Sequence, residues 1–290
     1  MENFEYVEPK TLKEAVRLLV KYKKGAKLLA GGTDLMVGMK DGSVRPKYLI
    51  NLKKIKGLDK ISYSKKKGLS IGSLVTWTNI LSSKPIHQYY PILWQAASLI
   101  GCPQIRNMGT IGGNICHASP SADSAPALMV YGAQCVIAGP GKDRVIPVEE
   151  IFAGVQKISL REGEILTGFH LPTPDTESKG CYLKFSLRKA MDLPIVGVSV
   201  LVRTSNGTFQ DVKIALGAVA PTPIRAKKTE RFLSGKPIDD DTIRRAAEEA
   251  VMESKPITDV RASREYRLGL VEELTYRAIT LSISKNITLE

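Results

Sequence analysis

Two glycine-rich segments contain the residues of this sequence that are best suited to bind an anion. They are Lys27-Leu28-Leu29-Ala30-Gly31-Gly32-Thr33-Asp34 and Gly109-Thr110-Ile111-Gly112-Gly113-Asn114. Adjacent glycines lack a Cβ and adopt positive φ angles, so that successive backbone N–H groups can point at one anion. One such pair more often only turns the chain, but a diphosphate needs donors on two sides, and both segments also carry hydroxyl or amide groups. We therefore interpret the two segments together as a candidate diphosphate-binding site.

The common sequence patterns for nucleotides, metals and nucleophilic catalysis do not occur. The chain has neither GxxxxGK[ST] nor GxGxxG, so nucleotide binding has to rest on a different geometry. His87, His117 and His170 lie at no metal-ligand spacing, and the GxSxG elbow of a hydrolase is missing. The four cysteines form no CxxC pair, which argues against a zinc or iron–sulfur site and predicts reduced thiols.

Composition and charge limit the class of protein. Of 290 residues, 43% are hydrophobic and 24% charged, which is typical of a globular chain with one large domain or two. The formal net charge is +13, and the lysine clusters lie beside turns without a nucleic-acid-binding motif. This basic surface is either simply solvated or a docking face for acidic partners or nucleic acid. Because the sequence shows no signal-peptide pattern and no apolar run long enough for a membrane span, we expect a cytoplasmic protein.

Local signals predict a strand, a turn and a helix around the first glycine segment. Thr11-Leu12-Lys13-Glu14 is a capping-box pattern that predicts a helix over about residues 12–24. Residues 27–30 then predict a short buried strand, 34–39 a short helix and 48–52 a second strand. A strand end, a glycine turn and a helix start form an anion site, because the first N–H groups of the helix have no partner within it.

The rest of the chain predicts an α+β fold. The predicted strands are 69–74, 134–138, 145–147, 165–171, 182–187, 195–203 and 212–219, and the predicted helices are 76–81, 90–100, 119–131, 241–253 and 263–282. The Asn206-Gly207 pair predicts a tight hairpin. A polar stretch marked by proline and glycine over 172–180 is the best candidate for a domain boundary.

Four side chains near the second glycine segment each allow two interpretations. Arg106 is either structural or neutralises a phosphate, and Cys116 is either a small buried thiol or a ligand contact. His117 either satisfies local hydrogen bonds or touches a ligand. Asp123 is either a helix cap or, beside phosphate loops, an acceptor for hydrogen bonds from a ribose or an adenine.

Seven blocks of residues, in order along the chain, resemble the FAD-binding medium subunit of molybdenum hydroxylases. The blocks are 27–34, 71–73, 101–107, 109–116, 121–123, 214–226 and 261–267. The similarity is strongest to bacterial xanthine dehydrogenase FAD subunits and covers nearly the whole chain. No single block is specific, whereas seven in the right order are.

This resemblance implies a fold and its division into domains. Residues 1–175 would form a FAD-binding domain of the PCMH or vanillyl-alcohol-oxidase type, with subdomains at about 1–58 and 59–175. Residues 176–290 would form a small α+β domain like the C-terminal domain of carbon monoxide dehydrogenase flavoproteins, with an antiparallel sheet and helices.

The resemblance also implies roles for the candidate residues. The two glycine segments would hold the FAD diphosphate between the subdomains, and Asn114 and Asp123 fall where the family contacts the nucleotide. Ile165, Leu183 and Lys184 fall where it flanks the isoalloxazine, although we expect an aromatic residue at the position of Leu183 in relatives. On this interpretation, Gly32→Val or Gly112→Val would abolish FAD retention by placing a side chain where a phosphate oxygen approaches.

The function implied by the family is electron transfer. A large subunit would hydroxylate its substrate at a molybdopterin centre, and a small subunit with two [2Fe–2S] clusters would pass the electrons to this FAD. The FAD would then reduce NAD+ or another acceptor, and the three chains would assemble as a dimer of heterotrimers. Lacking cysteine clusters of its own, this chain would supply only the flavin step and no catalytic or metal-ligating residue.

Several alternatives remain open from the sequence. The Gly31-Gly32-Thr33-Asp34 segment differs from the Gly-Gly-His-Ser form of carbon monoxide dehydrogenase flavoproteins, which favours a xanthine or other N-heterocycle dehydrogenase. A flavin subunit of a carbon monoxide or aryl-CoA dehydrogenase is the first alternative. A stand-alone flavin oxidase and a basic nucleic-acid-binding protein without flavin are the others.

Overall fold

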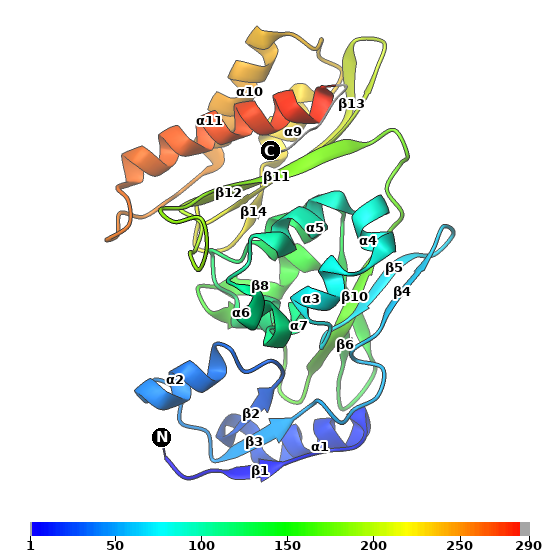
Figure 1. Cartoon of the computed structure of the whole chain (residues 1–290), viewed down its shortest axis with the longest axis vertical. Coiled ribbons are helices and arrows are strands. Elements are labelled where there is room, and N and C mark those ends of the chain that lie inside the picture. Colours follow the sequence, from blue (N-terminus) through cyan, green and yellow to red (C-terminus); the bar gives the residue numbers. More distant parts are fainter. Residues whose placement is uncertain (1, 285–290) are drawn as a thin grey trace.

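The computed structural model describes residues 2–284, which form three stacked parts (Figure 1). The first part is a small parallel sheet in the order β1-β3-β2, accompanied by two helices. Its elements are β1 (Glu5–Val7), α1 (Leu12–Tyr22), the 3-10 helix η1 (Lys23–Gly25), β2 (Ala26–Leu29), α2 (Leu35–Asp41) and β3 (Tyr48–Asn51). The first glycine segment connects β2 to α2, as the sequence predicts.

The second part is an antiparallel sheet in the order β4-β5-β10-β6-β7, packed against six short helices. Its strands are β4 (Ile61–Ser64), β5 (Gly68–Gly72), β6 (Gln134–Ala138), β7 (Arg144–Pro147) and β10 (Ile165–Leu171). Its helices are α3 (Trp77–Leu81), α4 (Lys84–Tyr89), α5 (Pro91–Ser98), α6 (Pro103–Met108), α7 (Ile111–His117) and α8 (Ser124–Val130). A 3-10 helix η2 (Val148–Ile151) and a small hairpin of β8 (Phe152–Gly154) and β9 (Lys157–Ile158) complete it.

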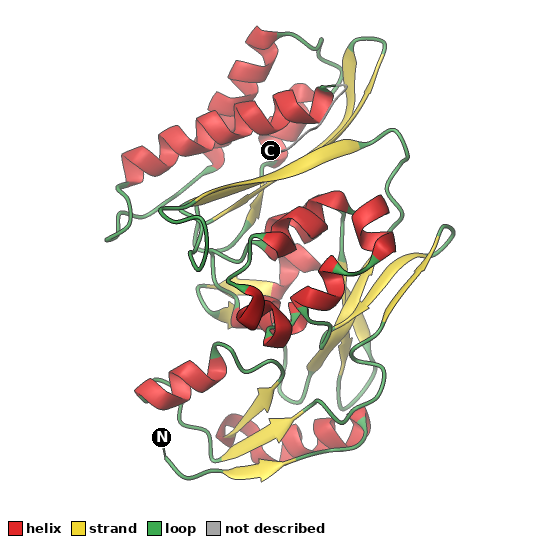
Figure 2. Cartoon of the chain, in the orientation of Figure 1, coloured by secondary structure: helices red, strands yellow, loops and turns green. Residues whose placement is uncertain are grey.

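The third part is an antiparallel sheet in the order β11-β12-β13-β14, covered on one face by three helices (Figure 2). The strands are β11 (Lys179–Phe185), β12 (Val196–Ser205), β13 (Thr208–Gly217) and β14 (Ile224–Arg225), and the helices are α9 (Lys227–Leu233), α10 (Asp240–Glu253) and α11 (Arg264–Ile283). The opposite face of this sheet packs on α5 and α8 of the second part. Strand β11 therefore lies at the contact between the second and third parts.

Three hydrophobic clusters correspond to these contacts. The cluster of the second part surrounds Trp77, Tyr90 and Phe169 and also takes in Tyr182 of β11. Another lies between the third sheet and its helices, and a small one joins α1 to the second part. Among the described residues, no helix combines the length and the apolar character that a bilayer crossing requires.

The α+β class is confirmed, and most local predictions agree with the structure. The Thr11 side chain accepts a hydrogen bond from the Glu14 N–H at 3.2 Å, as expected at the start of α1. Asn206 and Gly207 have φ angles of 49° and 73°, the positive values that a two-residue hairpin turn favours. Strands β1 and β4 are not among the predictions, and the predicted helix over 119–131 begins only at Ser124.

Candidate functional site

The two glycine segments face each other across the junction of the first and second parts. A Cβ added to Gly31 would lie 2.2 Å from the Met108 backbone oxygen and 3.0 Å from the Gly109 Cα. Ala30 contacts the other segment as well, because a Cβ at Gly113 would lie 3.9 Å from the Ala30 Cβ. Only glycine allows the two backbones to approach this closely, so Gly31 brings the predicted donors together.

The first segment has backbone donors available for a ligand. None of the N–H groups from Gly31 to Asp34 donates a hydrogen bond to another residue within 2–284. Gly32 has a φ of +80°, and α2 begins directly after Asp34, whose side chain makes no capping hydrogen bond. Consecutive unpaired N–H groups at a turn with a left-handed residue form a concave anion-binding surface. This segment therefore fits one side of a diphosphate.

The second segment differs from the sequence prediction, because Gly112 and Gly113 lie in helix α7 and the N–H groups of Ile111, Gly112 and Gly113 already have partners. The N–H of Ile111 donates to the Val75 oxygen at 3.0 Å, and that of Gly112 donates to the Ser73 oxygen at 2.9 Å. The N–H of Gly113 donates to the Thr110 Oγ1 at 3.1 Å. The second side of the site therefore has to rely on side-chain groups rather than on a second set of free N–H groups.

Two side chains of the second segment carry suitable donors. The hydroxyl of Thr110 accepts from Gly113 and keeps its own hydrogen for another partner. The Asn114 Oδ1 accepts from the Ser124 hydroxyl at 2.7 Å, which leaves its amide NH2 without a partner within 2–284. Asn114, Gly113 and His117 form the partly exposed face of α7, and the His117 Nε2 lies 3.9 Å from the Asp34 Oδ1 of the first segment.

Gly112 has a structural role that the sequence did not indicate. A Cβ at this position would lie 2.5 Å from the Ser73 Cβ and 2.6 Å from its backbone oxygen. The reason given for the Gly112→Val prediction is therefore wrong. The valine side chain would collide with Ser73, which directly follows β5, and not with a phosphate. We still expect the substitution to disturb the site, since it would displace α7.

Asp123 and Lys184 form a buried ion pair near the second glycine segment, because Ser124, next to Asp123, donates to the Asn114 Oδ1. The Lys184 Nζ lies 3.2 Å from the Asp123 Oδ2, and the side chains are 6% and 7% exposed. Tyr182 donates its hydroxyl to the other oxygen, Asp123 Oδ1, at 2.7 Å. Burial raises the pKa of Asp123 to about 6, even though the contacts with Lys184 and Tyr182 lower it. Asp123 precedes α8 without a capping hydrogen bond, so the capping interpretation is wrong.

The structure places Ile165 in a cluster that Leu28 and Ala30 of the first glycine segment pack against, whereas the Leu183 side chain packs in the third part. Ile165 is 1% exposed and packs into the cluster that joins α1 to the second part. Leu183 packs against the cluster of the third part, on the face of β11 opposite to Tyr182 and Lys184. Of the two roles considered for Arg106, the structure supports the structural one, because its Nη1 donates to the backbone oxygens of Ser98 and Ile100.

The structure adds one residue that the sequence interpretation missed. Tyr182 alternates with Leu183 along β11 and so shares a face with Lys184, which the period of two in a strand could have revealed. Cys116 packs against the apolar cluster of the second part, and burial raises the pKa of its thiol to about 12. Cys116 is partly exposed, so the structure fits an inert thiol packed on the apolar cluster and not a fully buried one.

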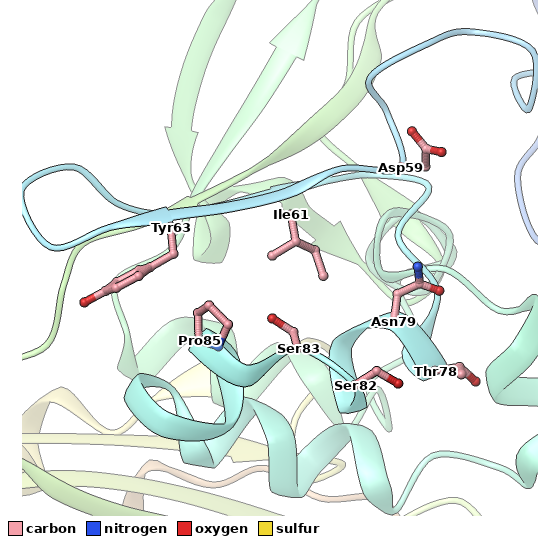
Figure 3. Close-up of a pocket in the computed structure, with 8 residues that line it drawn as sticks. All are labelled: Asp59, Ile61, Tyr63, Thr78, Asn79, Ser82, Ser83 and Pro85. Carbon is pink, nitrogen blue, oxygen red and sulfur yellow. The ribbon is translucent and has the colours of Figure 1, made fainter.

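A separate hollow of about 410 Å³ lies between the β4 hairpin and helices α3 and α4 (Figure 3). It is lined by Asp59, Ile61, Tyr63, Thr78, Asn79, Ser82, Ser83 and Pro85. None of the predicted site residues contributes to it. It is therefore distinct from the junction between the glycine segments.

Comparison with known proteins identifies two family domains in the chain. Residues 2–174 match the FAD binding domain in molybdopterin dehydrogenase, and residues 181–281 match the CO dehydrogenase flavoprotein C-terminal domain. The xanthine dehydrogenase FAD-binding subunit of Escherichia coli O157:H7 is 34% identical over 280 residues, which cover 96% of each chain. The carbon monoxide dehydrogenase medium chain of Hydrogenophaga pseudoflava is 33% identical over 95% of this chain and 96% of its own.

Solved structures give the same result. Carbon monoxide dehydrogenase from Hydrogenophaga pseudoflava, in a form that lacks the Mo-pyranopterin moiety of its cofactor, contains a chain that superposes with a TM-score of 0.94 at 33% identity. The superposition covers 97% of both chains. Nearly the whole of this chain is thus similar to one chain of a molybdenum enzyme.

Proposed function

The chain belongs to the family of molybdopterin dehydrogenase chains that carry this FAD-binding domain, and from that premise we propose that it is an electron-transfer subunit. FAD, when bound, takes up electrons one at a time and releases them as a pair to an acceptor. The chain's own residues would bind the cofactor, orient it and set the charge around it. We also propose the division into 1–58, 59–175 and 176–290, with the cofactor held between the first two parts.

The observation that supports this proposal most strongly is the row of free N–H groups from Gly31 to Asp34 opposite Thr110 and Asn114. These groups can donate to the two phosphates of FAD from opposite sides, because Gly31 keeps the segments in contact. The remaining residues of the two segments shape the walls of the site. They are Lys27, Leu28, Leu29, Ala30, Gly32, Thr33, Gly109, Ile111, Gly112 and Gly113.

We place the isoalloxazine toward Lys184 and thus also toward Asp123, whose Oδ2 lies 3.2 Å from the Lys184 Nζ. Of the two nucleotide contacts implied by the family, we therefore keep only Asn114. The ammonium group of Lys184 would favour the added negative charge of the reduced cofactor whenever the Asp123 carboxylate does not neutralise it. Ile165 and Leu183 stay predictions, and since their side chains pack into cores, we propose that they contribute backbone atoms only.

We propose that the electron donor is another chain. Within 2–284 there is no group of three or more His, Cys, Asp or Glu side chains placed to hold a metal ion. We propose that a small subunit with two [2Fe–2S] clusters delivers the electrons, and that a large molybdopterin subunit generates them by hydroxylating a substrate. The acceptor is NAD+ or another oxidant, and the complex is a cytoplasmic dimer of heterotrimers. A carbon monoxide or aryl-CoA dehydrogenase subunit is the alternative within the family.

Purification from the native host tests this function. A tag on this chain is expected to recover a large subunit that contains molybdenum and a small subunit that contains iron, with one FAD per tagged chain. Acid precipitation should leave the yellow colour in the supernatant, because the chain offers no covalent link to the flavin in our proposal. A colourless chain, or one that is isolated alone and oxidises a substrate by itself, would contradict it.

A further inference from the structure

The Asp123–Lys184 pair is unusual among the ion pairs of the described residues, because both of its side chains are nearly inaccessible to solvent. In each of the other pairs, at least one side chain is more exposed to solvent than those of Asp123 and Lys184. In Arg144–Glu164, for example, the side chains are 23% and 7% exposed. A buried carboxylate is costly unless charge and hydrogen bonds compensate it. Lys184 compensates one oxygen, and the Tyr182 hydroxyl compensates the other.

The Tyr182 hydroxyl reaches Asp123 through a space that Gly197 leaves open. Strand β12 pairs with β11 so that Gly197 lies opposite Lys184, next to the Tyr182 ring. A Cβ at Gly197 would lie only 2.6 Å from the Tyr182 hydroxyl oxygen. The missing side chain in β12 therefore allows a hydroxyl from the third part to reach a carboxylate of the second part.

Lys184 uses all three of its ammonium hydrogens. Besides Asp123, its Nζ donates to the Leu99 oxygen at 3.2 Å and to the Asp192 oxygen at 2.8 Å. The two backbone acceptors leave its positive charge uncompensated, so the net charge at this position depends on whether Asp123 is ionised.

Most other charged groups on elements packed against Asp123 and α8 are engaged elsewhere. Arg225 contacts the Met129 oxygen, at the opposite end of α8, and pairs with Glu230. The remaining groups lie on η2, on β13, on α7 and on the β11–β12 connection. On η2, Glu149 pairs with Lys227, and Glu150 has no ion-pair partner among the described residues. On β13, Asp211 pairs with Lys213. On α7, His117 lies near Asp34, and on the β11–β12 connection the Asp192 carboxylate pairs with Arg188. Lys184 is thus the group that controls the Asp123 charge together with Tyr182.

We propose that Tyr182 is a positioning residue that keeps Asp123 ionised against Lys184 and so holds the flavin side of the site electrically neutral. This inference rests on the proposed function, since it requires the isoalloxazine beside Lys184. Without the hydroxyl, Asp123 would take up a proton at higher pH. Lys184 would then present an uncompensated positive charge, which would favour electron uptake by the cofactor.

The first test uses the full-length chain without cofactor. The titration of the Asp123 carboxyl carbon is followed by 13C NMR, with Asp123→Asn to assign the signal, in the wild type and in Tyr182→Phe. Loss of a hydrogen bond to a charged group typically changes an acid dissociation constant roughly tenfold or more. The midpoint of the Asp123 titration is therefore expected to rise by about one pH unit or more in Tyr182→Phe. Tyr90→Phe is the matched control, because Tyr90 is equally buried but donates to the backbone oxygens of Leu171 and Pro172.

The second test measures the reduction potential of the bound flavin as a function of pH in the same variants. At pH values between the Asp123 midpoints of the wild type and of Tyr182→Phe, the variant is expected to have the higher reduction potential. Well above both midpoints, the two potentials should be equal. Gly197→Ala, which keeps the hydroxyl but displaces it, should shift both measurements in the same direction. An unchanged carboxyl midpoint, or an unchanged potential at full flavin content, overturns the inference. Failure of the wild-type chain to take up FAD would instead overturn the proposed function.

Discussion

Replacing Gly31 by alanine is expected to weaken FAD binding by roughly 10- to 100-fold. The added Cβ would lie 2.2 Å from the Met108 oxygen, a distance at which the two glycine segments cannot stay in contact. Overpacking of this kind typically costs about 1–3 kcal/mol, and each 1.4 kcal/mol changes a dissociation constant tenfold. The measurement is the flavin content after purification, together with a fluorescence titration of the apo chain with FAD.

Gly141→Ala provides the matched control for this experiment. A Cβ at Gly141 meets nothing within 4 Å, and its φ is not positive, so the variant should bind FAD like the wild type. Circular dichroism would confirm that both variants fold. Unweakened binding by a folded Gly31→Ala chain would show that the cofactor does not need the contact between the two segments.

Replacing Asp259 by asparagine is expected to destabilise the protein by about 3 kcal/mol at neutral pH, because it leaves a buried guanidinium without its counter-ion. Arg267 is 1% exposed, and its Nη2 lies 2.8 Å from the Asp259 Oδ1. Its Nη1 donates to the Ile195 oxygen at 2.7 Å, so the same side chain connects the segment before α11 to the start of β12. Urea unfolding of the wild type and the variant measures the loss.

The same pair predicts how stability depends on pH. Partial burial raises the pKa of Asp259, but hydrogen bonds from Arg261 and Arg267 outweigh it and hold the pKa well below its ordinary value. A carboxylate with a lowered pKa stabilises the fold above its unfolded-state pKa, and this stabilisation is lost as the pH falls toward the folded-state value. The difference between wild type and Asp259→Asn should therefore shrink below about pH 4.

An exposed ion pair supplies the control for this second prediction. Glu273 and Arg277 pair along α11 with side chains 52% and 62% exposed, so Glu273→Gln should change the unfolding transition little. A loss in Asp259→Asn as small as that of Glu273→Gln would mean that Arg267 is not held by the Asp259 charge.

Local signals in the sequence were sufficient for much of the fold. The cap at Thr11 and the hairpin at Asn206-Gly207 depend on neighbouring residues only, and both agree with the structure. Strands β6 and β10 have the predicted bounds, because each is a short apolar run between turn residues. Strands β1 and β4 could not be found in this way, since they have only three and four residues and depend on their partners in the sheet.

The candidate site shows where sequence reasoning stops. Sequence reasoning identified both glycine segments. It could not show that the N–H groups of Ile111 and Gly112 donate to the backbone oxygens of Val75 and Ser73, because these residues lie far away in the sequence. Both faces of β10 are buried, on two different clusters, so alternation along the strand could not show which way Ile165 points. Tyr182 was missed because its role depends on the space left by Gly197 in the neighbouring strand.

The free N–H groups of the first glycine segment are the donors on which the proposed FAD site most directly depends. The decisive measurement is a 1H–15N correlation spectrum of the glycine-labelled apo chain, recorded during titration with FAD. We predict that the Gly31 and Gly32 signals shift and saturate at one equivalent, while the signals of Gly132 and Gly141, which belong to neither glycine segment, stay in place. Saturable FAD binding that leaves Gly31 and Gly32 unchanged would contradict the account.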